Sequence, residues 1–214
     1  MSRLVVGALD LADALHNVAP HAEHDSRLGM PVLQHLLLDV DVDNDRLLVV
    51  GTDRYTLAEQ GVPLRPDAST TDAGARVLLH VPEVKPLTRA LVKYAGRDET
   101  RTAAVDLEQR QLTIGASTLA LDGMQDGEFP RYRTLFPDAD AKGKGHAVVG
   151  VGAQHIAKYA DLWLHGRKTG VVDLLRLTTG TTPTKPIGVA PIGLLDRGVH
   201  FRSLLMPVRL EAAA

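Results

Sequence analysis

The chain has 214 residues and a formal net charge of −2, and 44% of its residues are hydrophobic and 23% charged. This composition is typical of a soluble globular protein with one large domain or two small ones, and the absence of an apolar run of about 18 residues excludes a membrane-spanning helix. The absence of cysteine excludes disulfides, thiolate catalysis and cysteine-ligated zinc, and the charge argues against a wholly basic nucleic-acid binder but not against one with a single positive face.

The first part of the chain predicts a helix followed by three strands. Apolar residues recur at helical spacing between Leu9 and Val18. Segments with strand-like alternation follow, and Asn, Asp and Gly residues supply the turns between them. The predicted strands are 36–42, 46–50 and 55–62. A polar stretch at 65–74 is predicted as a connecting loop.

A second unit with the same order of elements begins near His80. Its predicted helix spans 84–95, with Pro86 in the first turn, where proline is tolerated. The strands that follow are predicted at 102–107, 111–116 and 118–122. The chain therefore repeats a unit of strand, helix and strands.

A third unit follows a linker rich in Gly and Lys at 138–145. Its predicted strand is 146–151 and its predicted helix is 153–164. Further strands are predicted at 171–178, 186–190 and 200–210. The helix starts are about 70 to 75 residues apart, which indicates a repeat of element types rather than of residues.

Four short segments, in their order along the chain, resemble the bacterial sliding clamp, the beta subunit of DNA polymerase III. Met30–Leu33 resembles a Pro-Val-Leu segment of that family, and Gly51–Ala58 resembles its Ala-Thr-Asp-Gly-His-Arg-Leu-Ala segment. Gly127–Arg133 is similar to Gly-x-Phe-Pro-Asp-Tyr-Arg, and Met206–Leu210 matches the final Met-Pro-x-Arg-Leu. Since proline cannot donate a ladder hydrogen bond, Pro207 is expected where the last strand leaves its sheet.

The resemblance implies an α+β DNA clamp (processivity) fold with helices inside and sheets outside. Family members have three domains of two halves each, whereas this chain shows about three halves, as a shortened phage-type member would. The expected divisions are a complete clamp-type domain at 1–128 (halves 1–66 and 75–128), a linker at 129–145, a terminal half domain at 146–210 and a tail at 211–214. Since family rings contain twelve halves, four copies are favoured slightly over three.

The resemblance also implies a function. We expect a non-catalytic, cytoplasmic processivity factor that encircles double-stranded DNA without sequence preference and binds a DNA polymerase and other proteins with clamp-binding motifs. A clamp loader is left open as a further partner, and no cofactor is expected. The alternative is a clamp-like module that forms no ring and instead sequesters clamp-binding peptides or modulates a host clamp.

Basic residues on the predicted inner helices are the candidates for DNA contact. Three of them recur at i, i+4 and i+8 on the second helix, opposite its apolar face. Such residues are more often only a solvated surface, so their assignment depends on the resemblance. Asp10 and Asp13 on the first helix argue against a uniformly positive lining. The candidates are Lys85, Arg89, Lys93, Arg97, Lys158, Arg167 and Lys168.

The resemblance further implies a hydrophobic groove for partner peptides. The family's Gly-His-Arg is replaced here by Arg54, Tyr55 and Thr56, and the bulkier Tyr55 is expected to narrow the groove. The alternative is that Leu57, Leu204 and Met206 are core residues. The predicted groove residues are Thr52, Tyr55, Thr56, Leu57, Pro130, Leu135, Leu204, Met206, Pro207, Val208 and Arg209.

An enzymatic function has less support. His21, Glu23 and His24, joined by His16, invite a metal site, but they lack the His-Glu-x-x-His order of metalloproteases. The acidic run 39–45 lacks the glycine and glutamate of a calcium loop and is better read as a strand entering a turn. No Gly-x-Ser-x-Gly or phosphate-binding glycine motif occurs in the required setting. We therefore predict no catalytic residue and no metal site.

Overall fold

The fold is described from a computed structural model of the chain. The structure describes residues 3–25, 30–66, 76–124, 127–136, 151–168, 175–178 and 185–207. The predicted linker at 138–145, most of the predicted strand at 146–151 and the tail at 211–214 lie outside these residues. Within the described ranges, no helix is long and apolar enough to cross a membrane.

The first unit starts with a strand that runs directly into a helix. β1 (Arg3–Gly7) leads into α1 (Ala8–Val18), and β2 (His35–Asp41), β3 (Arg46–Thr52) and β4 (Thr56–Pro63) follow as antiparallel neighbours. These elements agree with the predicted ones to within a few residues. Short 3-10 turns connect them: η1 (Ala19–His21), η3 (Pro31–Gln34) and η4 (Val42–Asn44).

The second unit repeats this order. It consists of β5 (Arg76–His80), α2 (Val81–Ala95), β6 (Thr102–Asp106), β7 (Gln111–Ile114) and β8 (Ser117–Ala120). α2 begins three residues before the predicted start. The N–H groups in the first turn of a helix have no partner within the helix, so a proline there costs no hydrogen bond. α2 can therefore include Pro82 at its second position.

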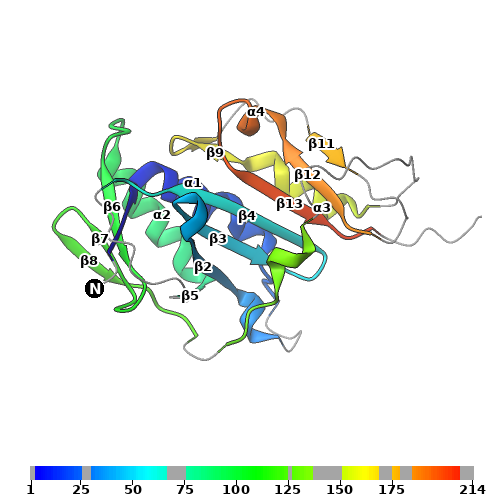
Figure 1. Ribbon diagram of the computed structural model, residues 1–214, viewed down its shortest axis with the longest axis horizontal. Helices are drawn as coiled ribbons and strands as arrows, with labels where there is room; N and C mark the ends of the chain where they lie inside the picture. The colour runs from blue at the N-terminus through cyan, green and yellow to red at the C-terminus, as the bar shows by residue number, and fades with distance from the viewer. Residues whose placement is uncertain are drawn as a thin grey trace, which may run out of the picture.

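The two units exchange their first strands. β1 pairs with β6 in a four-stranded sheet of order β1-β6-β7-β8, whereas β5 pairs with β2 of the first unit. Each sheet therefore contains strands from both units, which ties the two units into one body. α1 and α2 pack side by side behind the larger sheet (Figure 1).

Alternation along the strands divides the core into two clusters. Leu36 and Leu38 of β2 face the helices and belong to the larger cluster. Leu37 of the same strand belongs to a smaller cluster on the opposite, outer face of the sheet. Phe129 and Tyr132 cover this outer face and are 8% and 3% exposed. Since both faces are covered, β2 is a nearly continuous apolar run.

The terminal part of the chain extends the larger sheet. β13 (Phe201–Leu205) pairs with β4, and the sheet then has the order β11-β12-β13-β4-β3-β2-β5. β13 ends just before Met206 and Pro207, as the proline predicted. The remaining elements are η5 (Tyr132–Leu135), α3 (Ala153–Ile156), η6 (Ala157–Asp161), β9 (Trp163–Leu164), β10 (Arg167–Lys168), β11 (Leu175–Thr178), β12 (Ile187–Pro191) and α4 (Ile192–Leu195).

The predicted helix at 153–164 is too long. Helical structure ends at Asp161, and Trp163 begins a hairpin whose turn residues, His165 and Gly166, both have positive φ (54° and 72°). Positive φ at both positions is typical of the turns that suit a two-residue hairpin. Asn17 of α1 holds the hairpin, since its side chain hydrogen-bonds both the backbone N–H and the carbonyl of Trp163 (2.5 and 2.9 Å).

The structure also contains a helix that the sequence analysis missed. α4 follows β12 without an intervening residue, as α1 follows β1 and α2 follows β5. The residues before α1, α2, α3 and α4 share one backbone conformation, with φ between −69° and −62° and ψ between 119° and 131°. The described residues therefore contain four helix entries of one type, two of them after residue 150. The predicted division of the chain at 128 and 145 stays a prediction.

Candidate functional site

Two of the segments singled out in the sequence meet where β4 begins and β13 ends. Leu57 lies opposite Leu204 and Thr56 opposite Leu205 in the antiparallel register. Beyond the last pair, the backbone N–H of Met206 donates to the carbonyl of Tyr55 at 2.8 Å. Sequence positions about 150 residues apart thus form one continuous surface.

Asp53 organises the turn that leads into β4. Its Oδ1 accepts hydrogen bonds from the N–H groups of Tyr55 and Thr56 (3.0 and 2.6 Å) and from the Thr56 hydroxyl (2.9 Å). Thr52 closes the turn by donating to the Thr56 carbonyl at 2.7 Å. Arg54 lies between them with φ 76°, a conformation that favours glycine. Thr52 and Thr56 are therefore buried parts of this turn.

Lys158 of η6 binds the same turn. Its Nζ lies 2.5 Å from Asp53 Oδ2 and 3.0 Å from Thr56 Oγ1, and the lysine and aspartate side chains are 16% and 13% exposed. Burial by itself would raise the pKa of Asp53, but the hydrogen bonds from Lys158 and Thr56 outweigh it and lower this pKa. The structure thus places Lys158, predicted as a DNA contact, in the wall of the candidate groove.

The exposed apolar residues of the candidate groove are Tyr55, Leu135 and Met206, which are 52%, 51% and 40% exposed. Tyr55 stacks on His155 of α3, with 5.3 Å between ring centroids. Leu57 and Leu204 are buried in the smaller core cluster, as the core alternative predicted for them. Pro207 is half-buried, and Val208 and Arg209 lie outside the described residues.

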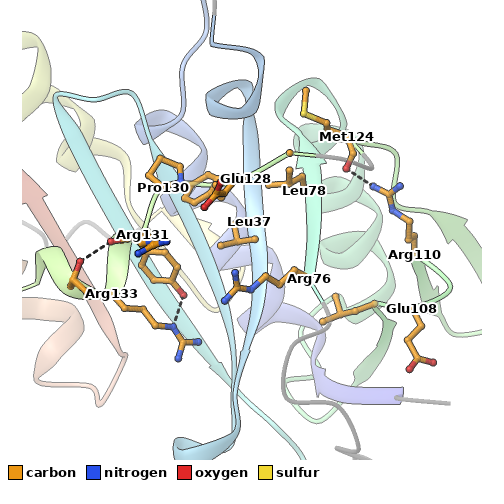
Figure 2. Close-up of a pocket in the computed structure, with 15 residues that line it drawn as sticks. Leu37, Arg76, Leu78, Glu108, Arg110, Met124, Glu128, Pro130, Arg131 and Arg133 are labelled. Carbon is orange, nitrogen blue, oxygen red and sulfur yellow. Dashed lines mark hydrogen bonds between the residues drawn. The ribbon is translucent and has the colours of Figure 1, made fainter.

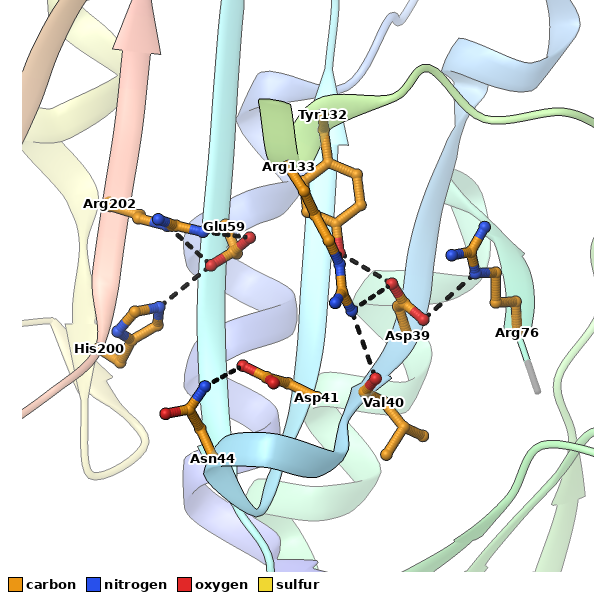
Figure 3. A network of polar contacts seen from close by, with 10 residues as sticks. All are labelled: Asp39, Val40, Asp41, Asn44, Glu59, Arg76, Tyr132, Arg133, His200 and Arg202. Carbon is orange, nitrogen blue, oxygen red and sulfur yellow. Dashed lines mark hydrogen bonds and ion pairs between the residues drawn. The ribbon is translucent and has the colours of Figure 1, made fainter. Parts of the chain in front are cut away.

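The segment Phe129–Phe136 crosses the outer face of the larger sheet. Pro130 lines a cavity on the side of the segment that faces β2 and β5 (Figure 2). Tyr132 and Arg133 fasten the segment to Asp39 of β2, with distances to Asp39 Oδ2 of 2.9 Å from the tyrosine Oη and 2.8 Å from the arginine Nη2 (Figure 3). The Tyr132–Leu135 turn therefore has a fixed position over the sheet.

A second polar cluster joins β4 to β13 on the same face (Figure 3). Glu59, 1% exposed, accepts hydrogen bonds from Arg202 at 2.9 and 3.2 Å and lies 3.1 Å from Nε2 of His200. Burial alone would raise the pKa of Glu59, but these partners lower it. Arg202 also covers the ring of Phe136 at 4.0 Å. This cluster fixes the register of the junction that carries the candidate groove.

The basic row of α2 is exposed on the face opposite the buried residues of the helix. Val84, Leu87 and Leu91 are buried, whereas the predicted DNA contacts of this helix are exposed. Within the described part of the chain, none of these cations has an ion-pair partner. The exposed residues are Lys85, Arg89, Lys93 and Arg97.

α1 presents almost no surface, because the β9–β10 hairpin covers the face turned away from the sheet. Gly166 of this hairpin lies against Leu9 of α1 and Val92 of α2, and its N–H donates to Asp13 Oδ1 at 2.8 Å. Burial raises the pKa of Asp13 to about 7. Asp13 is thus a buried hydrogen-bond acceptor rather than a surface charge.

The hairpin carries two further predicted DNA contacts. Arg167 and Lys168 form β10 and are exposed, and Lys168 pairs with Asp161 at 3.1 Å. Asp10, the other acidic residue of α1, lies 3.8 Å from Arg65. Gly166, which precedes these basic residues, lies against Leu9 of α1 and Val92 of α2, so the hairpin lies over the seam between the two helices.

The histidines near residue 20 do not assemble a metal site. His21 is fully buried beside Tyr159 and Phe201, and burial lowers its pKa to about 3, so the ring is neutral. Nε2 of His24 contacts the carbonyl of Ala19 instead. Among the residues that the structure describes, no group of three or more His, Asp or Glu side chains is placed to hold a metal ion.

The sequence analysis missed the buried polar residues that hold these surface segments in place. Asp39 and Asp13 were seen only as members of an acidic run and as a surface charge, and Asn17 carried no signal. Asp53 had a local signal, because aspartate is typical of a turn that bonds its own backbone. Glu59 could have been noticed as the one charged residue of the strand 56–63, since a buried charge requires a partner.

Solved structures share this arrangement over nearly the whole chain. A DNA polymerase sliding clamp from Pseudomonas aeruginosa is 16% identical, with a TM-score of 0.61 over 98% of this chain and 66% of the clamp. The Caulobacter crescentus pol III beta protein is also 16% identical, with a TM-score of 0.59 over 98% of this chain and 66% of that protein. No protein-family model and no curated protein matches the sequence.

These similarities confirm the predicted fold class, the sliding-clamp fold. The chain spans about two thirds of the length of the clamps that it matches, 66% in both cases. The matched structures are those of sliding clamps. A further P. aeruginosa clamp with a TM-score of 0.60, 16% identity and coverage of 97% and 65% is bound to griselimycin.

Proposed function

We propose that the chain is a sliding clamp, a ring of several copies that encircles duplex DNA and tethers a polymerase. The observation that carries the proposal is the exposed basic row of α2, Lys85 to Arg97, on the face of the helix pair turned away from the sheets. A clamp needs this charge on the inside of the ring, because sequence-independent binding depends on attraction to phosphates.

The DNA-facing surface would consist of α2 and the β9–β10 hairpin. Arg167 of the hairpin adds a cation beside α2, while the two acidic residues of α1 are withdrawn by burial or by pairing. Asp10 and Asp13 therefore no longer argue against a positive lining. Lys158 has no part in this surface, because Asp53 binds its ammonium group.

The ring would contain three copies rather than the four that the sequence slightly favoured. The described residues contain four helix entries of one type, and we take each as the start of one half domain. If a clamp ring holds twelve halves, as the resemblance implies, three copies complete it. The share of the matched clamps that the chain spans, 66%, also fits two domains out of three.

Partner proteins would dock at the exposed apolar residues Tyr55, Leu135 and Met206. These side chains surround the junction of β4 and β13, which the Glu59–Arg202 pair holds in register. An adaptable methionine beside a rigid turn suits a surface that accepts different peptides. The chemistry of the groove thus supports binding of short apolar motifs from a polymerase.

Two experiments test the ring. Light scattering on the purified chain should give a mass of about three times 23.0 kDa. Protein assembled on DNA should be retained on a closed circle and lost when the circle is linearised, since a ring slides off free ends. Equal retention on both forms would contradict encirclement.

A second function is favoured by the exposed apolar residues Tyr55, Leu135 and Met206, which would bind peptides whether or not a ring forms. As a clamp-like module without a ring, the protein would sequester clamp-binding peptides or modulate a host clamp. A stable monomer that still binds such peptides would select this function over the first.

A further inference from the structure

The cavity that Pro130 lines opens on the outer face of the larger sheet and has a volume of about 910 Å³. Leu37 and Leu78 lie at its centre, the segment around Pro130 forms one wall and the turn with Arg110 forms the other (Figure 2). Such a volume is within the usual range for ligand pockets and holds several side chains of an extended chain.

The floor of this cavity is apolar and its walls are fixed. Leu37 and Leu78 are paired across β2 and β5. Arg110, with φ 53°, donates from Nη2 to the carbonyl of Met124 at 2.9 Å and so joins the turn to the far wall. Gly123 lies so close to β5 that a Cβ there would be 1.5 Å from the Leu78 carbonyl oxygen. The site is therefore largely preformed.

Positive charge dominates the rim. Four arginines line the cavity, Arg76, Arg110, Arg131 and Arg133, against the two carboxylates of Glu108 and Glu128. The buried Asp39 neutralises one of the four, since it is shared by Arg76 and Arg133, whose side chains remain 57% and 49% exposed. Arg131 has no ion-pair partner among the described residues. The chain as a whole has a net charge of −2, so this surplus of positive charge is a local feature of the cavity.

We propose that this cavity, the arginine pocket, is a second docking site for an acidic, apolar peptide segment of a partner protein. An aliphatic side chain of the segment packs on the accessible Met124 and Pro130, above the buried Leu37 and Leu78. Neighbouring carboxylates pair with Arg131 and with the free N–H groups of Arg76. Charge complementarity specifies the acidic residues, and the apolar floor specifies the aliphatic one.

The arginine pocket and the candidate groove lie on opposite sides of one segment, and Pro130, which was predicted for the groove, lines the pocket instead. The Pro130–Leu135 segment forms a ridge between them, anchored to Asp39 through Tyr132 and Arg133. Thr134 lines the pocket, whereas the next residue, Leu135, was predicted to line the groove. The two sites can therefore be tested separately, and the pocket does not depend on the groove.

The test uses a fluorescein-labelled peptide, Gly-Leu-Glu-Leu-Asp-Gly, and fluorescence anisotropy with the full chain. Arg131→Glu is the informative variant, because this side chain is exposed and makes no structural contact that the structure describes. Arg97→Glu on α2 is the matched charge reversal elsewhere, and Met206→Ala removes a groove contact. A peptide with Gln and Asn in place of Glu and Asp tests the requirement for charge.

We expect Arg131→Glu and the uncharged peptide each to weaken binding about five- to tenfold, while Arg97→Glu and Met206→Ala leave it unchanged. Methyl resonances of Leu37 and Leu78 should shift when the peptide binds. The proposal is overturned if the peptide does not bind, if Arg131→Glu binds equally well, or if Met206→Ala instead abolishes binding. Equal urea midpoints for the variants will show that each is folded.

Discussion

Lys158 and Asp53 form a largely buried ion pair, with 2.5 Å between Nζ and Oδ2, that joins η6 to the turn before β4. The pair connects a terminal segment to a turn about 105 residues earlier, at the edge of the candidate groove. Because the same carboxylate accepts two backbone N–H groups of the turn, its charge state and the shape of the groove wall are coupled.

Removing the lysine should therefore destabilise the protein. Lys158→Met leaves Asp53 as a partly buried carboxylate without its cation, and we expect a loss of about 2–3 kcal/mol in the free energy of unfolding. Urea denaturation at pH 7 measures it. The control is Lys168→Met, whose pair with Asp161 is 63% and 57% exposed and should contribute less than about 1 kcal/mol. Equal effects of the two substitutions would show that burial of the Asp53 pair is unimportant.

Arg54 is held in a left-handed backbone conformation, φ 76°, with its guanidinium 5.8 Å from the ring centroid of Tyr55. Glycine adopts this conformation without a steric penalty, so Arg54→Gly should raise the free energy of unfolding by about 0.5–1 kcal/mol. Arg54→Ala retains the Cβ and should bring no gain. If alanine stabilises as much as glycine, the arginine side chain rather than the backbone is the source of the cost.

Asp13 should lower the free energy of unfolding as the pH rises. Its folded pKa is raised to about 7 from an unfolded value near 3.8, so the folded state binds the proton more tightly. The contribution of Asp13 to stability should therefore fall as the pH rises from about 4 to 7, by up to about 4 kcal/mol, and then level off. The buried His21, whose pKa is lowered to about 3, contributes in the opposite direction between about pH 3 and 6.5, and acid also removes the contributions of Asp53 and Glu59, whose pKa values are lowered. The effect of Asp13 is therefore measured as a difference between the wild type and a variant.

The check is Asp13→Asn, which retains an acceptor for the Gly166 N–H. The slope of the free energy of unfolding against pH, between pH 5 and 8, should be more positive in this variant than in the wild type. The variant should also exceed the wild type in stability at pH 8, where the wild-type carboxylate is ionised. An unchanged slope would assign the pH dependence to other groups.

The sequence predicted those parts of the molecule that depend on local pattern. The period of apolar residues in α2 predicted the exposed basic row correctly, because burial of one helix face determines the other. The short segments at Tyr55 and Met206 were correctly grouped, although by their resemblance to a family and not by any local rule. Strand alternation also predicted that Leu204 or Leu205 would be core.

The remainder depends on contacts between distant segments. A helix was predicted through Trp163, but Asn17 binds the backbone of this residue in a hairpin, and this contact lies 146 positions away. Lys158 was assigned to DNA, and its partner Asp53 could not be foreseen because it lies 105 positions away in the sequence. Asp39 was read as one acid in a strand, since nothing nearby indicates that Tyr132 and Arg133 will cover it.

If α2 lies against DNA, its cations should determine the salt dependence of binding. Each phosphate contact contributes about 0.9 to the slope of log K against log salt concentration, so Arg89→Gln should reduce the slope by about that amount. Fluorescence anisotropy with a labelled duplex at several salt concentrations measures it. Arg131→Gln, on the outer face of the sheet, is the matched control and should leave the slope unchanged. A slope that both variants alter equally would indicate a diffuse attraction rather than an inner surface.

If partner peptides dock at the junction of β4 and β13, the exposed side chain of Met206 should contribute directly. Its backbone N–H binds Tyr55, so truncating the side chain leaves the strand in place while it removes contact area beside Tyr55. Met206→Ala should weaken the binding of a polymerase C-terminal peptide at least about fivefold, as expected for a central apolar contact. Leu177→Ala is the control, because this leucine is 51% exposed on the edge strand β11. If the two substitutions change affinity equally, exposed apolar area in general rather than this junction binds the peptide.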